Sequence, residues 1–308
     1  MADRRRMTWR QRLGRDKILL LVAMPGIASL LLFHYVPLLG NVIAFKDYQP
    51  FIGILDSPWV GLANFAIIVN GDPAFLNALV NTLIITILQV VVVFPVPIGL
   101  ALLINSLLSE RLKRFVQSVL YLPYFLSWVI VVAIFQFMLG DAGLMNNMLR
   151  DYDLGTVSVI GNPDAFFALI TGQVLWKEAG WATIIFLAAL ARIDPTLYEA
   201  SAVDGAGRWR QLWHVTLPGL RSLIILLLIL RLGDALSVGF EQIVLQQQAV
   251  GKDASEVLDT YVYNNGVVDG EWGPSAAVGL VKGLVGLLLV LGANRLAHRF
   301  GEQGVYQK

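Results

Sequence analysis

Charged residues and tryptophans lie in the middle of two long apolar stretches of the sequence, where an ionised side chain needs a particular reason to be present. The residues concerned are Trp176, Lys177, Glu178, Trp181, Arg231 and Asp234. In lipid, each such charge is costly unless it is paired or hydrated. Polar groups beside an aromatic ring suit a sugar, whose ring face can stack while its hydroxyl groups form hydrogen bonds. The pattern therefore predicts either the lining of a pathway for a polar solute or a set of internal ion pairs.

The two alternatives differ in what Arg231 contacts. Arg231 and Asp234 are three residues apart, so on one face of a helix they would form an ion pair. Trp181 follows Lys177 by about one turn and would share its face, which favours a joint surface for a sugar. From the sequence both alternatives stay open. Glu241, near the outer end of the same stretch as Arg231, is a candidate for part of an outer gate.

A second group of candidate residues lies in the polar loop 192–221 between the two stretches. Asp194 is a favourable helix N-cap, and Pro195 suits the first helical turn. Gly205 can end that helix in the left-handed conformation, and a second short helix is expected to end at Pro218. The candidate residues are Glu199, Ala200, Ser201, Asp204, Gly205, Leu217 and Pro218. The small side chains of Ala200, Ser201 and Ala202 would let another protein approach closely, whereas the alternative is a surface helix that merely joins two spans.

The spacing in this loop resembles the EAA loop of ATP-binding-cassette (ABC) importer permeases. That motif reads Glu-Ala-Ala, three residues, Gly, nine residues, Ile, one residue, Leu-Pro. The positions that match it are Glu199, Ala200, Gly205, Leu217 and Pro218. Ser201 replaces the second alanine and Val215 replaces the isoleucine, and both replacements keep size or shape.

The resemblance implies an all-α integral membrane protein with six transmembrane helices and a type I ABC importer permease-like fold. It implies that this chain is not an enzyme and holds no cofactor, because ATP and magnesium would bind to two separate ATPase subunits. A second homologous permease would complete the pore, and an extracytoplasmic binding protein would deliver the substrate. The loop would dock in a groove on an ATPase subunit. It would couple the closure of the ATPase dimer to the opening of the pathway.

Further segments resemble the carbohydrate-uptake branch of these permeases. They are Tyr35-Val36-Pro37, residues 60–65, residues 188–190 and residues 193–195. Residues 45–48 and 259–263 resemble its polysaccharide and oligosaccharide subgroup. The resemblance implies uptake of oligosaccharides. The alternatives are an ABC permease for another solute, such as a peptide or a polyol, or a secondary transporter that needs no ATPase.

The composition indicates which elements must position these residues. Of the 308 residues, 56% are hydrophobic and only 15% are charged, whereas about a quarter of a soluble domain is charged. The apolar residues form runs long enough to cross a bilayer as helices. The expected spans are 18–45, with a bend near Pro37, then 75–108, 115–139, 166–191, 222–245 and 275–296. The sequence thus predicts a basic N-terminus, 1–17, followed by one transmembrane domain, 18–308.

Lysine and arginine predict the orientation of these spans. Seventeen of them lie in the termini and in the loops around residues 111–114 and 192–221, against three in the opposite loops. Because cytoplasmic loops carry the excess of positive charge, both termini and the loop 192–221 are expected in the cytoplasm. The expected location is therefore the cytoplasmic membrane, with the lipid bilayer and no nucleic acid as a partner.

The sequence does not contain the residues that several kinds of catalytic, metal-binding or nucleotide-binding site require. The sequence contains no cysteine, which excludes thiol catalysis and thiolate metal sites. His34, His214 and His298 lie on separate segments without the spacing of metal ligands, so no metal site is expected. No phosphate-binding Gly-x4-Gly-Lys-Ser/Thr motif is present either, so the chain does not bind ATP by that route.

Overall fold

Helices form nearly all the regular structure of this chain. The computed structural model describes residues 9–299 and 301, and within those residues the only β structure is an isolated bridge between Lys46 and Trp59. The helices of the first half are α1 (Trp9–Leu30), α2 (Val36–Leu39), α3 (Gly53–Asp56), α4 (Ala66–Val69), α5 (Pro73–Leu88), α6 (Pro95–Asn105), α7 (Glu110–Tyr121), α8 (Trp128–Leu139) and α9 (Leu144–Asp151). Those of the second half are α10 (Pro163–Leu190), α11 (Pro195–Val203), α12 (Arg208–Gln211), α13 (Leu217–Gly233), α14 (Phe240–Val250), α15 (Lys252–Ser255), α16 (Leu258–Tyr263) and α17 (Trp272–Arg299).

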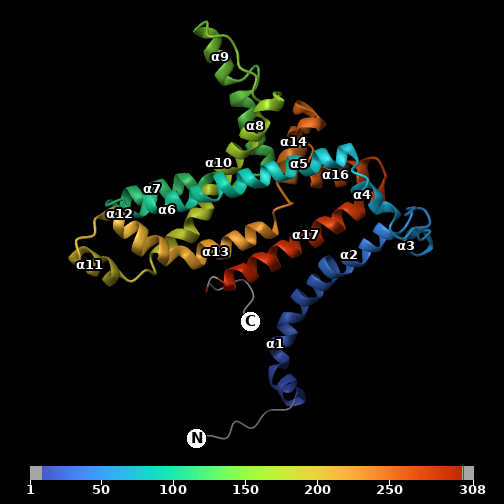
Figure 1. Ribbon diagram of the computed structural model, residues 1–308, viewed down its shortest axis with the longest axis horizontal. Helices are drawn as coiled ribbons and strands as arrows, with labels where there is room; N and C mark the ends of the chain where they lie inside the picture. The colour runs from blue at the N-terminus through green and yellow to red at the C-terminus, as the bar shows by residue number, and fades with distance from the viewer. Residues whose placement is uncertain (1–8, 300, 302–308) are drawn as a thin grey trace.

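The predicted all-α fold with six membrane spans is confirmed. Five helical stretches are long and apolar enough to cross a membrane: Asp16–Phe45, Pro73–Asn105, Trp128–Asp151, Arg208–Gly233 and Trp272–Arg299. The sixth span is α10, which together with α11 forms a pair bent by 69°. Figure 1 shows α5 and α6 following one another beside the long α13 and α17, while α1 with α2 and α8 with α9 leave this body in opposite directions.

The predicted spans 18–45, 75–108, 166–191 and 275–296 agree with the structure to within a few residues. Helix α1 begins at Trp9, inside the predicted basic N-terminal segment 1–17. Residues 1–8 and the chain end at 302–308 lie outside the described residues.

The third span, expected as one helix over 115–139, was predicted wrongly. Helix α7 ends at Tyr121, a short 3₁₀ turn follows, and Leu126 and Ser127 are extended before α8 begins at Trp128. Ser127 accepts the backbone N–H of Ile130 at 3.4 Å and so serves as the N-cap of α8. Hydropathy does not reveal such a break, because the residues on both sides of it are apolar.

The fifth span, expected over 222–245, is also interrupted. Helix α13 ends at Gly233, and six non-helical residues, 234–239, separate it from α14. Arg231 and Asp234 therefore lie at the end of a helix and not midway along one. The expected short helix ending at Pro218 is wrong as well, since α12, a π-helical turn at Leu212–Thr216 and α13 form one continuous helix over Arg208–Gly233.

Three of the long helices contain a π-helical turn two residues before a proline. These turns are Leu31–Tyr35 before Pro37, Gln89–Val93 before Pro95, and Leu212–Thr216 before Pro218. Proline cannot donate a backbone hydrogen bond and its ring crowds the carbonyl of the preceding turn, so the helix must widen or bend there. In the second of these turns, the N–H of Phe94 donates to the carbonyl of Gln89, five residues earlier, at 2.9 Å.

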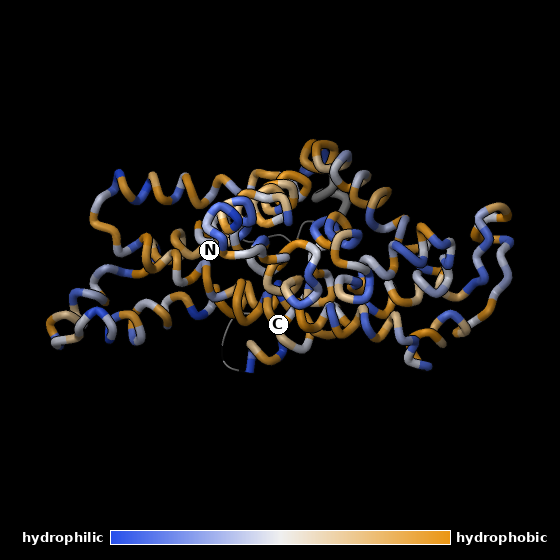
Figure 2. The backbone as a smooth tube through the Cα atoms, turned by 90° about the horizontal axis from the view of Figure 1, so that it is seen from above, coloured by the Kyte–Doolittle hydropathy of each residue, from blue (hydrophilic) through white to orange (hydrophobic). Residues whose placement is uncertain are grey.

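The spans pack closely in some places and expose apolar surface in others. Gly180 of α10 lies directly against the backbone of α7, where a Cβ atom would come within 1.9 Å of the carbonyl oxygen of Leu120. A buried cluster of Ala101, Phe186, Leu190 and Leu220 joins α6, α10 and α13. Elsewhere the helices are apolar along much of their length (Figure 2), and large hydrophobic side chains are exposed on α1 and α17. Exposed apolar side chains of this kind are expected where lipid is the solvent.

Candidate functional site

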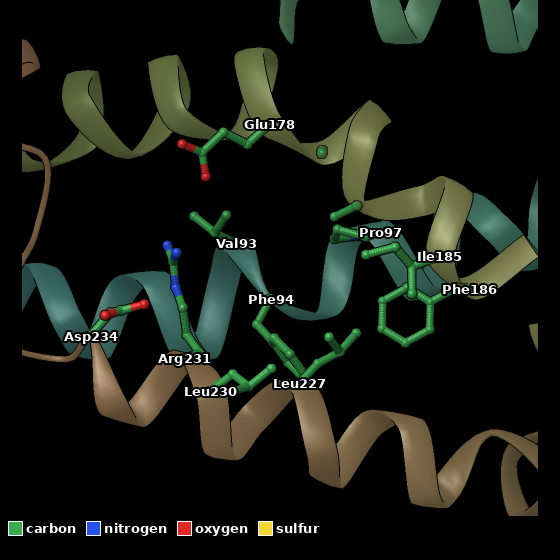
Figure 3. A pocket seen from close by; sticks show the side chains of 12 residues that line it. Val93, Phe94, Pro97, Glu178, Ile185, Phe186, Leu227, Leu230, Arg231 and Asp234 are labelled. Carbon is green, nitrogen blue, oxygen red and sulfur yellow. The ribbon is translucent and has the colours of Figure 1, made fainter. Parts of the chain in front are cut away.

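A cavity of about 270 Å³ lies between α6, α10 and α13. Most of its wall is apolar, and three charged side chains complete it (Figure 3): Glu178 of α10, and Arg231 and Asp234 at the end of α13. Glu178 extends from one side toward the guanidinium group of Arg231 on the other. Of the predicted pathway residues, the structure thus brings these three together. An apolar cavity with a few convergent polar groups is typical of a site for a small solute.

The ion pair between Arg231 and Asp234, one of the two alternatives that the sequence left open, does not form. The Nη2 atom of Arg231 donates to Oε1 of Gln89 at 3.0 Å, and no carboxylate of the described residues lies within 4.0 Å of the guanidinium group. Gln89 begins the π-helical turn that follows α5 and is only 8% exposed. Sequence reasoning missed this residue, although an amide in the middle of the predicted span 75–108 was a visible signal.

Lys177 is held away from the cavity and lies 8% exposed against α7 and α8. Its Nζ atom donates to the backbone carbonyls of Tyr124, at 2.9 Å, and of Leu126, and it lies 5.5 Å from the ring centre of Trp128. These carbonyls are freed by the break between the two helices. In lipid, backbone groups need a partner within the protein. The prediction that Lys177 lines the pathway is therefore not supported, and the residue stabilises the broken third span.

The tryptophans of α10 contact α8 and the turn that precedes it. Trp181 stacks on Tyr124 with ring centres 4.6 Å apart, and Trp176 meets Phe135 edge-on at 5.8 Å. Both tryptophans are outside the lining of the cavity. Trp181 and Lys177 do share a neighbour, Tyr124, but the shared surface is a packing contact.

The segment after the break in the fifth span is fixed by buried polar groups. Glu241 is exposed in the first turn of α14, away from the cavity lined by Arg231. Gln242 and Gln246 of the same helix bond to Gln173 of α10 at 2.7 and 3.0 Å. Lys282 of α17 forms an ion pair with Asp259 of α16. These contacts place α14 to α16 firmly against the membrane spans.

The loop 192–221 begins with a well-capped helix. The backbone N–H of Thr196 donates to the carboxylate of Asp194 at 2.9 Å, and this hydrogen bond lowers the pKa of Asp194. Helix α11 ends at Val203, and Gly205, two residues further on, has a φ of +77°. The N–H of Ala206 then bonds to the carbonyl of Ser201 at 2.9 Å, and that of Gly205 to Ala202 at 3.0 Å. These two bonds form a Schellman ending, and its left-handed glycine is the one that the sequence predicted.

The seven candidate residues of this loop divide into two groups. Glu199, Ala200, Asp204, Gly205 and Pro218 are exposed, whereas Ser201 and Leu217 are half-buried. The hydroxyl of Ser201 donates to the carbonyl of Tyr198 at 2.8 Å and accepts from Gln211 at 3.2 Å. Tyr198 in turn reaches Thr216, with 3.1 Å between the two hydroxyl oxygens. The inner side of α11 is thus tied to the start of the fifth span, and its outer side is free for a partner.

The six-helix fold, the bent α10–α11 pair and the intramembrane cavity together define a membrane permease. Residues 92–302 match the family of inner membrane components of binding-protein-dependent transport systems, and the chain belongs to this family. It is the permease subunit of an ABC importer.

Among its relatives, the polygalacturonan/rhamnogalacturonan transport system permease protein YteP of Bacillus subtilis is 48% identical over 296 residues, covering 96% of this chain and 92% of that protein. Protein LplB of the same organism is 43% identical and covers 97% of this chain and 94% of its own length. A chain of a bacterial alginate ABC transporter, in complex with an alginate-loaded periplasmic protein, is 36% identical with a TM-score of 0.87, covering 96% of this chain and 98% of that one.

Proposed function

We propose that this permease lines half of a pathway for oligosaccharides, with those that carry carboxylate groups as its preferred substrates. The observation that carries the proposal is the cavity between α6, α10 and α13, with the guanidinium group of Arg231 in its wall and no carboxylate paired with it. A guanidinium group binds a carboxylate in bidentate fashion and also donates to hydroxyl groups. The cavity volume is just below the roughly 300–1,000 Å³ typical of ligand pockets, which suits one sugar unit at a time.

The relatives support the same class of substrate. YteP is named for transport of polygalacturonan and rhamnogalacturonan, and the solved neighbour imports the acidic polysaccharide alginate. A more distant relative, at 28% identity, is the arabinooligosaccharides transport system permease protein AraP of Bacillus subtilis. The substrates named for these three transporters are all built of sugar units. Those of YteP and of the alginate transporter, the two proteins more similar to this chain, are acidic.

The proposal includes the partners of the chain. A second homologous permease completes the pore, an extracytoplasmic binding protein delivers the sugar, and two ATPase subunits that bind ATP and magnesium drive the cycle. The exposed side of α11, with Glu199, Ala200 and Gly205, is the docking element for an ATPase subunit. Support comes from its rigid attachment to the fifth span through Tyr198 and Ser201, because a rigid attachment transmits force. In this arrangement both termini and α11 face the cytoplasm.

Co-purification followed by reconstitution tests the proposal. The complex isolated through this chain should contain a second permease and an ATPase, and in liposomes it should import oligogalacturonides only with ATP and the binding protein. The controls are a neutral oligosaccharide, a peptide and a polyol. Import of the peptide or polyol alone, or import without ATP, would overturn the proposal.

A further inference from the structure

Gln89 meets Arg231 behind the wall of the cavity. Its Oε1 atom accepts a hydrogen bond from Nη2 of Arg231 at 3.0 Å, yet Gln89 itself is not among the lining residues. The residue is nearly buried, and the π-helical turn that it begins directs it toward the end of α13. Three residues earlier, the hydroxyl of Thr86 bonds to the carbonyl of Ala235 in the break after α13. The segment that carries Arg231 is thus held from α5 at two points.

The chemistry of this contact matters because the amide is neutral. Glu178 and Asp234 line the same cavity, and either carboxylate would neutralise Arg231 if the guanidinium group turned to it. A glutamine oxygen takes one of the five N–H donors of an arginine and leaves the charge in place. The remaining donors have no partner among the described residues and are free to meet a solute.

We propose that Gln89 is a positioning residue that determines substrate specificity: it holds the Arg231 guanidinium group toward the cavity, unneutralised, for the carboxylate of a uronic acid unit. Gln89 acts through Arg231 and does not touch the substrate. This inference rests on the proposed function, since it assumes that the cavity belongs to the pathway.

Two substitutions separate orientation from charge. Gln89→Glu keeps the shape and places a carboxylate on Arg231, so the pair becomes neutral. Gln89→Met keeps the length and removes the acceptor, so Arg231 is free to turn to Glu178 or Asp234. The control is Gln248→Glu, which makes the same change of charge at an exposed position of α14. Each variant is purified as the full complex, and its thermal unfolding temperature is measured.

Uptake is then compared for an oligogalacturonide and for the same oligomer after reduction of its carboxyl groups. The same binding protein, preloaded with either sugar, makes delivery common to all variants. We expect Gln89→Glu to lower the acidic-to-neutral uptake ratio on the order of tenfold, as loss of one hydrogen bond to a charged group implies. Gln89→Met should raise the half-saturating concentration for the acidic sugar while the maximal rate for the neutral sugar stays the same. Gln248→Glu should leave the ratio unchanged.

Each outcome decides the matter. If both Gln89 variants lower the uptake of the two sugars equally, Gln89 has only a structural role and the inference is wrong. The inference is also wrong if both variants have the same acidic-to-neutral uptake ratio as the native complex. If Gln89→Met fails to assemble, the ratio of Gln89→Glu alone decides. If the native complex imports neither sugar, the proposed function fails and the specificity role of Gln89 fails with it.

Discussion

The ammonium group of Lys177 donates to the backbone carbonyl of Tyr124, 53 residues earlier in the chain, across a distance of 2.9 Å. A second bond, to Leu126, makes this side chain the donor for two backbone carbonyls in the break of the third span. The positive charge in α10 is therefore explained by a backbone requirement of two other helices. It belongs to the scaffold around the cavity, while its neighbour Glu178 belongs to the cavity.

Lys177→Met should destabilise the complex by roughly 2–4 kcal/mol, because hydrogen bonds to a charged donor are lost and buried carbonyls remain unpaired. The expected observation is a lower thermal unfolding temperature, with the acidic-to-neutral uptake ratio unchanged in the fraction that assembles. Lys113→Met is the control, since Lys113 makes only a surface pair with Glu110 at 3.5 Å. A Lys177→Met complex as stable as the native one would show that the broken span needs no such donor.

Gly205→Val should uncouple ATP hydrolysis from transport. At a φ of +77° a β-branched residue costs about 1–2 kcal/mol or more, so the end of α11 would rearrange. No heavy atom lies within 4 Å of the added Cβ position, so the effect comes from the backbone and not from a clash. Membrane insertion should be normal, while uptake and substrate-stimulated ATPase activity fall.

Gly207→Val is the matched control for this substitution. Gly207 also has open space around it, but its φ is −73°, which any residue adopts. The control complex should keep coupled transport. Full coupling in Gly205→Val would remove α11 as the docking element.

Arg231→Gln should give a complex that assembles normally and hydrolyses ATP but imports acidic oligosaccharides poorly. The reason is that Arg231 has a neutral hydrogen-bond partner, Gln89, so its removal breaks no ion pair. Adding Asp234→Asn should not rescue stability, because the two side chains are not paired. Low stability of Arg231→Gln that Asp234→Asn restores would instead establish a structural ion pair in the membrane.

Single cysteines test the orientation, and the natural chain offers no competing thiol. A label that cannot cross the membrane should react from outside at positions 56, 153 and 269, all exposed in the loops expected on that side. It should not reach positions 112 and 208, which are equally exposed but expected in the cytoplasm. Labelling of position 208 from outside would reverse the orientation and exclude docking of an ATPase on α11.

The sequence predicted those parts of the fold that depend on composition and local signals. Apolar runs identified four spans closely, and the small residues around Gly205 identified the end of α11. The two breaks were missed, since apolar residues surround both and their signals, Pro123 with Ser127 in one case and Gly233 with Gly239 in the other, are local and weak. Hydropathy averages over such signals.

The candidate site was predicted less well because its contacts join distant segments. The spacing of Arg231 and Asp234 suggested a pair, but the π-helical turn at Gln89 offers Arg231 another partner 142 residues away. Likewise, nothing near Lys177 in the sequence indicates that carbonyls more than 50 residues earlier need a donor. Local spacing can place residues on one face of a helix, but it cannot tell which neighbour occupies that face.

The π-helical turns before Pro37, Pro95 and Pro218 have a consequence for how chain length can vary in this protein. A π-helical turn accommodates one residue more than the α-helical turn it replaces. Deletion of one residue from Gln89–Val93 would let the helix close into a regular α-helix while the residues on both sides keep their faces, because the wide turn had absorbed the extra residue. Deletion of one residue from a regular α-helical part of the same span would instead rotate everything beyond it by about 100°. The three turns are therefore places where related permeases could gain or lose a residue without changing which helix faces meet or how many spans there are.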